Sequence, residues 1–214
     1  MKPPPFDYAA PTNLKDALRM LRDVEGSKVL AGGQSLMPIL AFRLAAPSLL
    51  VDIKNVPGLD QIRIDKDGVH LGARVRWVDI EKSKPLAAAH PLLVAAISHV
   101  AHYQIRNRGT VGGSVSHADP AAEMPGVAAT CDAVMEISSC DGTRTMPAKD
   151  FFQGALQTAL GEDEILVGLR LPAWPSGRRW AFEEFARRRG DFALAGALLH
   201  YDLEAVCSGV RLLL

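Results

Sequence analysis

The pattern of apolar positions at the start of the chain predicts a small unit of alternating helices and strands. Residues 11–26 read as a helix, because their apolar side chains recur at i, i+3, i+4 and i+7 and would face one core. Short apolar runs at 28–31 and 48–53 read as buried strands. A second helix is expected over 38–44, since proline suits a first helical turn.

Beyond residue 57 the texture changes to alternating polar and apolar positions joined by Asp-Gly turns, which is typical of antiparallel hairpins. Hairpins are expected at residues 61–71 and 131–146, and helices at 78–86 and 91–101. One long strand is expected at 164–171. The chain therefore combines an α/β beginning with a mixed α and β continuation.

The C-terminal stretch follows a linker of tryptophan, proline, serine and glycine at 174–177. Residues 180–186 and 193–203 read as strands or mixed segments, and the apolar run at 210–214 normally leads to a partner strand. About forty residues are too few for an independent core. We expect three domains, of which the last is incomplete, at residues 1–56, 57–173 and 178–214.

Composition narrows the class of protein. The 214 residues are 48% hydrophobic and 22% charged with a net charge of zero, which is ordinary for a globular protein and gives no field for nucleic acid. Only 6% are aromatic, which disfavours a base-stacking surface. The three cysteines form no C-x-x-C pair, and the sequence contains neither an apolar leader nor a run long enough for a membrane span. We expect a cytoplasmic protein.

Two glycine-rich segments carry the chemistry: a first at residues 31–35 (AGGQS) and a second at residues 110–114 (TVGGS). Each follows an apolar run read as a strand, and each ends in a hydroxyl residue. Glycine lets backbone N–H groups approach a diphosphate closely. Alone, the first segment is better interpreted as a plain strand-to-helix turn, and it is not the G-x-G-x-x-G fingerprint. Together they favour one dinucleotide held from two sides.

Polar residues near the second segment have two readings each. Asp119 or Glu123 would accept from ribose hydroxyls, or Asp119 would cap a helix that follows it. His117 is a candidate acid–base group without a visible partner, so a structural role is the simpler interpretation. Arg106 and Arg108 belong to a solvated face, or they contact a phosphate, the electron-rich end of a reduced flavin or a partner subunit. The histidine spacings predict no metal site.

Residues 31–38 (AGGQSLMP) and 104–125 (QIRNRGTVGGSVSHADPAAEMP) resemble the FAD-binding medium subunit of molybdenum hydroxylases, nearest to the carbon monoxide dehydrogenase medium subunits. Xanthine dehydrogenase carries a similar domain. The resemblance implies an α+β fold of the vanillyl-alcohol-oxidase (PCMH) type, with FAD between two α/β subdomains and a C-terminal α+β domain beyond them.

The resemblance also implies residue roles. Both glycine-rich segments would hold the diphosphate of noncovalently bound FAD, one of the two acidic residues would contact the cofactor, and Leu166 would touch the flavin region. A lysine that the xanthine dehydrogenase pattern has near the flavin is Ala186 here, with Arg187 as a substitute. The implied cofactor-binding set is Ala31, Gly32, Gly33, Gln34, Ser35, Leu36, Thr110, Gly112, Gly113, Ser114, Asp119, Glu123 and Leu166.

The implied function is electron transfer. Electrons from a molybdopterin-containing large subunit would pass through the [2Fe–2S] clusters of a small subunit to FAD and on to an external acceptor, in a dimer of heterotrimers. No catalytic side chain is expected, since the flavin carries the chemistry. The alternatives are a stand-alone PCMH-type flavin oxidoreductase, which would need a substrate pocket with a base, and a noncatalytic assembly subunit.

Overall fold

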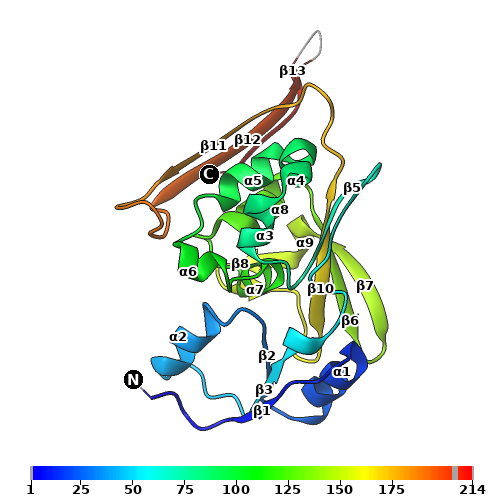
Figure 1. The fold of residues 1–214 in the computed structure, drawn as a ribbon, viewed down its shortest axis with the longest axis vertical. Helices are drawn as coiled ribbons and strands as arrows, with labels where there is room; N and C mark the ends of the chain where they lie inside the picture. The colour runs from blue at the N-terminus through cyan, green and yellow to red at the C-terminus, as the bar shows by residue number, and fades with distance from the viewer. Residues whose placement is uncertain (1, 204–206, 214) are drawn as a thin grey trace.

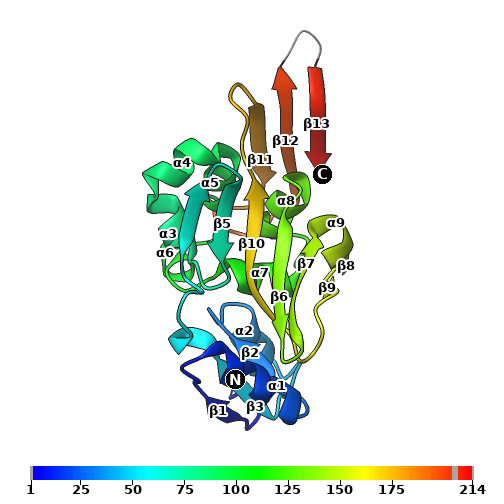
Figure 2. The ribbon, with the colours of Figure 1, turned by 90° about the vertical axis from the view of Figure 1, so that its right-hand side faces the viewer.

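The computed structural model describes residues 2–203 and 207–213, which form three parts arranged along one long axis (Figure 1). Each part is built around its own sheet, and Figure 2 shows the three sheets one above another. The sheets lie within the three ranges expected as domains, and we propose that division for the chain. None of the helices in these ranges is long and apolar enough to cross a membrane.

The N-terminal part is a parallel three-stranded sheet in the order β1-β3-β2. Its first helix is shorter than the predicted 11–26, because the Asn13 side chain accepts from the Asp16 N–H at 2.9 Å and starts the helix there. The elements are β1 (Asp7–Ala9), α1 (Leu14–Asp23), β2 (Lys28–Leu30), α2 (Leu36–Ala41), β3 (Leu49–Asp52) and the 3-10 turn η1 (Ile53–Asn55).

The middle part is a five-stranded antiparallel sheet, order β4-β5-β10-β6-β7, whose one face is covered by helices (Figure 1). Its strands are β4 (Ile62–Asp65), β5 (Gly68–Gly72), β6 (Val134–Ser139), β7 (Gly142–Pro147) and β10 (Ile165–Pro172), with the small pair β8 (Phe152–Gly154) and β9 (Gln157–Thr158). Its helices are α3 (Trp77–Lys82), α4 (Lys84–Ala89), α5 (Pro91–Ile97), α6 (Tyr103–Arg106), α7 (Val111–His117), α8 (Glu123–Thr130) and α9 (Ala148–Phe151). Both hairpins expected from Asp-Gly turns are present.

Two local predictions are wrong. The helix expected over 78–86 is two helices, because the Ser83 hydroxyl accepts from the Leu86 N–H at 3.3 Å and starts α4 afresh. The second glycine-rich segment is not a loop after a strand. It begins α7, follows the short helix α6, and has Thr110 as its N-cap.

The C-terminal part is an antiparallel sheet of β11 (Arg179–Phe185), β12 (Ala195–Leu203) and β13 (Cys207–Leu213). It packs on α8 through Leu198 and Leu213, over Gly126, where a Cβ would lie 3.1 Å from Leu198 Cδ1. The N-terminal part joins the middle part through a shared core in which Leu59 and Ile165 of the middle part are buried. The middle part is therefore packed against both neighbours.

Candidate functional site

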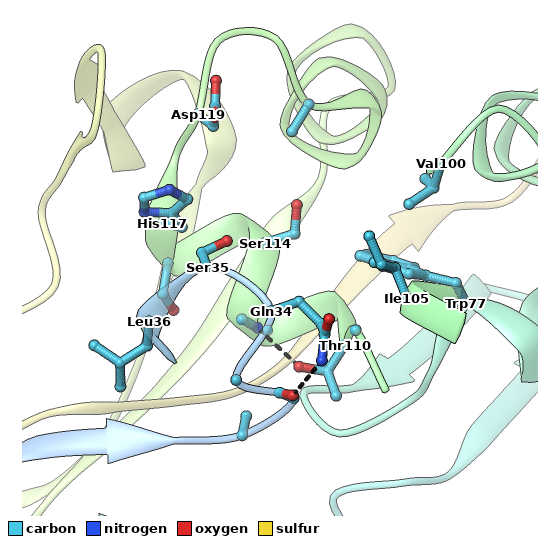
Figure 3. A pocket seen from close by; sticks show the side chains of 18 of the residues that line it. Gln34, Ser35, Leu36, Trp77, Val100, Ile105, Thr110, Ser114, His117 and Asp119 are labelled. Atoms are coloured by element: carbon cyan, nitrogen blue, oxygen red, sulfur yellow. Dashed lines mark hydrogen bonds between the residues drawn. The ribbon is translucent and has the colours of Figure 1, made fainter. Parts of the chain in front are cut away.

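The candidate site is a cavity of about 700 Å³ between the N-terminal and middle parts (Figure 3). This volume lies in the range of small-molecule and cofactor sites. The structure brings together every residue that the sequence proposed for cofactor binding. Those lining the cavity are Ala31, Gly32, Gly33, Gln34, Ser35, Leu36, Thr110, Gly112, Gly113, Ser114, Asp119, Glu123 and Leu166.

The first glycine-rich segment presents its backbone to the cavity. Gly33 has a φ of +73°, a conformation that favours glycine, and its carbonyl accepts from the Met37 N–H at 3.1 Å. The Gln34 side-chain amide donates to the Gly32 carbonyl at 3.2 Å, which braces the turn (Figure 3). Within the described residues, the N–H groups of Gly33, Gln34 and Ser35 donate to no protein acceptor. They are available to an anion.

The second glycine-rich segment contributes differently, because its amides are already engaged. The Gly112 N–H donates to the Ala73 carbonyl at 2.8 Å, and the Gly113 N–H donates to the Thr110 hydroxyl at 3.2 Å. A Cβ on Gly112 would lie 2.5 Å from the Cβ of Ala73. This glycine is therefore needed to seat α7 against the end of β5, and the Ser114 hydroxyl is the group that faces the cavity (Figure 3).

Gly32 of the first glycine-rich segment meets the backbone just before the second segment. A Cβ on this residue would lie 2.3 Å from the Arg108 carbonyl oxygen and 3.0 Å from the Gly109 Cα. Gly109 in turn packs on Trp77, whose Nε1 would be 2.5 Å from an added Cβ. The backbone before α7 thus packs against Gly32 on one side and against the Trp77 ring on the other, and neither Gly32 nor Gly109 has room for a side chain. The contact with Gly32 closes one wall of the cavity.

One end of the cavity is polar and includes Ser116, His117, Asp119 and Glu123. His117 and Asp119 lie on the same side in Figure 3, and the Asp119 carboxylate accepts from the Ala121 N–H at 2.9 Å. Burial raises the pKa of Glu123 to about 7 from its usual value, and the negative charges of Glu184 and Asp119 add to this rise. The Glu123 carboxyl is therefore about half protonated at pH 7.

Trp77, Val100, Ile105 and Phe192 also line the cavity with apolar side chains, and we call this group the apolar end. Three of these side chains gather together in Figure 3, and Phe192, on the β11–β12 connection, is 73% exposed. Sequence reasoning missed all four. Val100 lies within residues 91–101, which were expected to form one helix, and nothing in the local pattern shows that the β11–β12 connection returns to the cavity.

The arginines that were candidates for phosphate contact do not line the cavity. The Arg106 guanidinium donates to the Val100 and Ala101 carbonyls, both at 3.0 Å, and to Glu81 at 3.1 Å. Arg108 approaches the first glycine-rich segment through its carbonyl, and the Arg187 side chain is exposed outside the lining. Among the described residues no cluster of histidine, cysteine and acidic side chains is arranged to hold a metal ion.

A cavity closed by one glycine turn and by the start of α7, between a parallel α/β unit and an antiparallel sheet, indicates the class: a flavoprotein domain of the α+β FAD-binding type. The chain belongs to the family described as the FAD-binding domain in molybdopterin dehydrogenase, whose pattern matches residues 4–174. The family assignment made from the two sequence segments is confirmed.

The sequence is similar to the medium subunits of several named enzymes. The chain is 45% identical to the nicotine 6-hydroxylase medium subunit of Paenarthrobacter nicotinovorans, over 99% of its own length and 75% of the relative's. It is 39% identical to the carbon monoxide dehydrogenase medium chain of Hydrogenophaga pseudoflava, over 92% of its length and 69% of the relative's. It therefore spans about three quarters or less of these relatives.

Solved structures confirm the fold. Quinoline 2-oxidoreductase from Pseudomonas putida 86 matches with a TM-score of 0.94 and 41% identity, covering 99% of this chain and 74% of that one. Carbon monoxide dehydrogenase from Hydrogenophaga pseudoflava matches with a TM-score of 0.96 and 37% identity, covering 99% and 75%. The chain is thus an FAD-binding medium subunit of the molybdenum hydroxylase type.

Proposed function

We propose that this chain transfers electrons within a molybdenum hydroxylase complex. It would receive electrons from the [2Fe–2S] clusters of a small subunit and pass them through noncovalently bound FAD to an external acceptor, while a molybdopterin-containing large subunit oxidises the substrate. The observation that carries the proposal is one cavity lined by both glycine-rich segments, which lie far apart in the sequence.

The residues present fit the cofactor. The free amides of Gly33, Gln34 and Ser35 suit the negative charge of a diphosphate, with the Ser35 and Ser114 hydroxyls as additional donors. The apolar end suits the isoalloxazine ring, because a flat aromatic system is recognised by apolar and aromatic side chains. Leu166, buried on β10, lines the same cavity.

Bound FAD would supply the redox chemistry, since flavin accepts electrons singly and releases them in pairs. The chain's own residues bind it, orient it and exclude water. We propose a cytoplasmic dimer of heterotrimers as the working assembly.

The cofactor proposal is tested by comparing FAD with FMN. The purified chain is titrated with each flavin, following quenching of flavin fluorescence. We expect FAD to bind far more tightly than FMN, and ADP to compete with FAD, because the glycine-rich segments recognise the diphosphate. Equal affinity for FMN, or no binding of either flavin by folded protein, would contradict the proposal.

The electron-transfer proposal needs the partner subunits. The chain is co-expressed with the small and large partner subunits, and the assembled complex is reduced with its substrate. We expect the FAD absorbance to bleach only when the small subunit is present. Turnover of a small molecule by this chain alone would favour a stand-alone flavin oxidoreductase. Assembly without a reducible flavin would favour a noncatalytic subunit.

A further inference from the structure

The apolar end depends on a turn that the chain does not adopt readily. Residues 98–102 connect α5 to α6, and Ala101 in this turn has a φ of +40°. A residue with a Cβ is strained in this left-handed region, so the surrounding structure must hold it. The turn places Val100, Ala101 and His102 on the cavity lining. Its shape therefore sets one wall of the candidate site.

A single guanidinium holds this turn. The Arg106 Nη1 donates to the Val100 and Ala101 carbonyls, both at 3.0 Å, and the Nε donates to the Glu81 carboxylate at 3.1 Å. The Arg106 side chain is only 18% exposed. Glu81 lies on α3, which carries Trp77, and Arg106 lies on α6. One side chain thus joins three elements that each contribute to the apolar end.

The β11–β12 connection rests on the same turn. Gly190, with a φ of +87°, approaches it so closely that a Cβ would lie 2.6 Å from the Ala101 carbonyl oxygen and 2.7 Å from the His102 Nδ1. Phe192 follows two residues later and lines the cavity. The position of this aromatic side chain therefore depends on where the turn at Ala101 is held.

We propose that Arg106 is a positioning residue for the flavin: it does not touch the cofactor, but fixes the turn at Ala101 and the Phe192 connection in the arrangement that receives the isoalloxazine ring. This inference rests on the proposed function. Arginine is required because its planar fork donates to two carbonyls and a carboxylate at once, whereas a lysine ammonium on its flexible stem does not reproduce that geometry.

The test compares Arg106→Lys with Arg178→Lys. Arg178 is a matched control, because its side chain is also 18% exposed and donates twice to a carboxylate, Asp202, at 2.6 and 2.7 Å, away from the cavity. Both variants should lower the melting temperature. Only Arg106→Lys should raise the Kd for FAD, about tenfold, and alter the shape of the long-wavelength flavin band.

Each outcome decides the question. Arg106→Lys with an unchanged Kd and an unchanged flavin band overturns the inference, as do equal rises in Kd for both variants, since these would follow lost stability alone. If Arg106→Lys does not fold, variants at Glu81 decide. Because glutamine in Glu81→Gln still offers an acceptor to the Arg106 Nε, Glu81→Ala is compared beside it. The alanine variant keeps both carbonyl bonds, removes the Nε bond and should raise the Kd a few-fold, and no change in Glu81→Ala would overturn the inference. Failure of the wild type to bind FAD would instead refute the proposed function.

Discussion

Replacing Gly32 by alanine tests whether the first glycine-rich segment must touch the backbone that leads into the second, at Arg108 and Gly109. The added Cβ would lie 2.3 Å from the Arg108 carbonyl oxygen, whereas ordinary contact begins at 3.4 Å, so these two segments of backbone must separate by about 1.1 Å. The obstacle is backbone on both sides, and neither can rotate away as a side chain would. The substitution therefore opens one wall of the cavity.

The cost of such overpacking is about 1–3 kcal/mol. In the FAD-free protein the two parts can relieve part of it by moving apart. With the cofactor bound the cavity must be closed, so we expect the cost to fall mainly on binding. Since 1.4 kcal/mol is a tenfold change, the Kd for FAD should rise about 5- to 150-fold. Fluorescence titration measures this directly, and chemical unfolding reports the smaller change in the free energy of unfolding.

The control is Gly154→Ala, where the nearest atom to an added Cβ is the Gln157 Oε1 at 3.5 Å. This variant adds the same methyl group without a backbone clash and should leave the Kd unchanged. A Gly32→Ala protein that binds FAD as tightly as the wild type would refute the reasoning. It would mean that the segments have room to separate while the cofactor is held.

Three further predictions follow from exposure and charge. Phe192→Ala should weaken FAD binding and change the flavin spectrum with little loss of stability, whereas Phe185→Ala, which removes a similarly exposed ring outside the cavity, should change neither. Because burial raises the pKa of Glu123 to about 7, ionisation of this carboxyl opposes folding as pH rises from 4.5 through 7. The free energy of unfolding of Glu123→Gln should therefore exceed that of the wild type by up to about 3 kcal/mol at pH 8 and by nothing at pH 4. Urea unfolding without FAD measures this difference. Burial lowers the pKa of His90 to about 4, so the free energy of unfolding falls as pH drops from 6.5 towards 4. His90→Asn keeps an acceptor for the Leu93 N–H and should lose less stability over this pH range. Identical acid profiles for the variant and the wild type would contradict this assignment.

Element types were largely accessible from the sequence where one local signal dominated. Asp-Gly turns between alternating segments predicted both hairpins, and these depend only on turn geometry and side-chain period. Helix boundaries were less accessible because competing caps decide them. Ser83 splits a continuous apolar pattern into two helices through one hydroxyl–amide bond, which the apolar period cannot reveal.

The sequence by itself determined the family, because the two glycine-rich segments and their flanks form a dense local pattern. It did not determine why those glycines are needed. From the sequence, each of these glycines is predicted to donate its backbone N–H to a diphosphate. Among the described residues, the amides of Gly112 and Gly113 are engaged, whereas those of Gly33, Gln34 and Ser35 are free. Gly32 and Gly112 are glycines because the Arg108 carbonyl and Ala73 occupy the space of a Cβ.

The apolar end was decided only by tertiary structure. Trp77, Val100 and Phe192 come from three separated elements, and no local period links them. They converge because Arg106 ties the turn before α6 to α3, and because the β11–β12 connection rests on that turn. Contacts between distant segments carry no local sequence signature, since each side chain satisfies its own element equally well without the others.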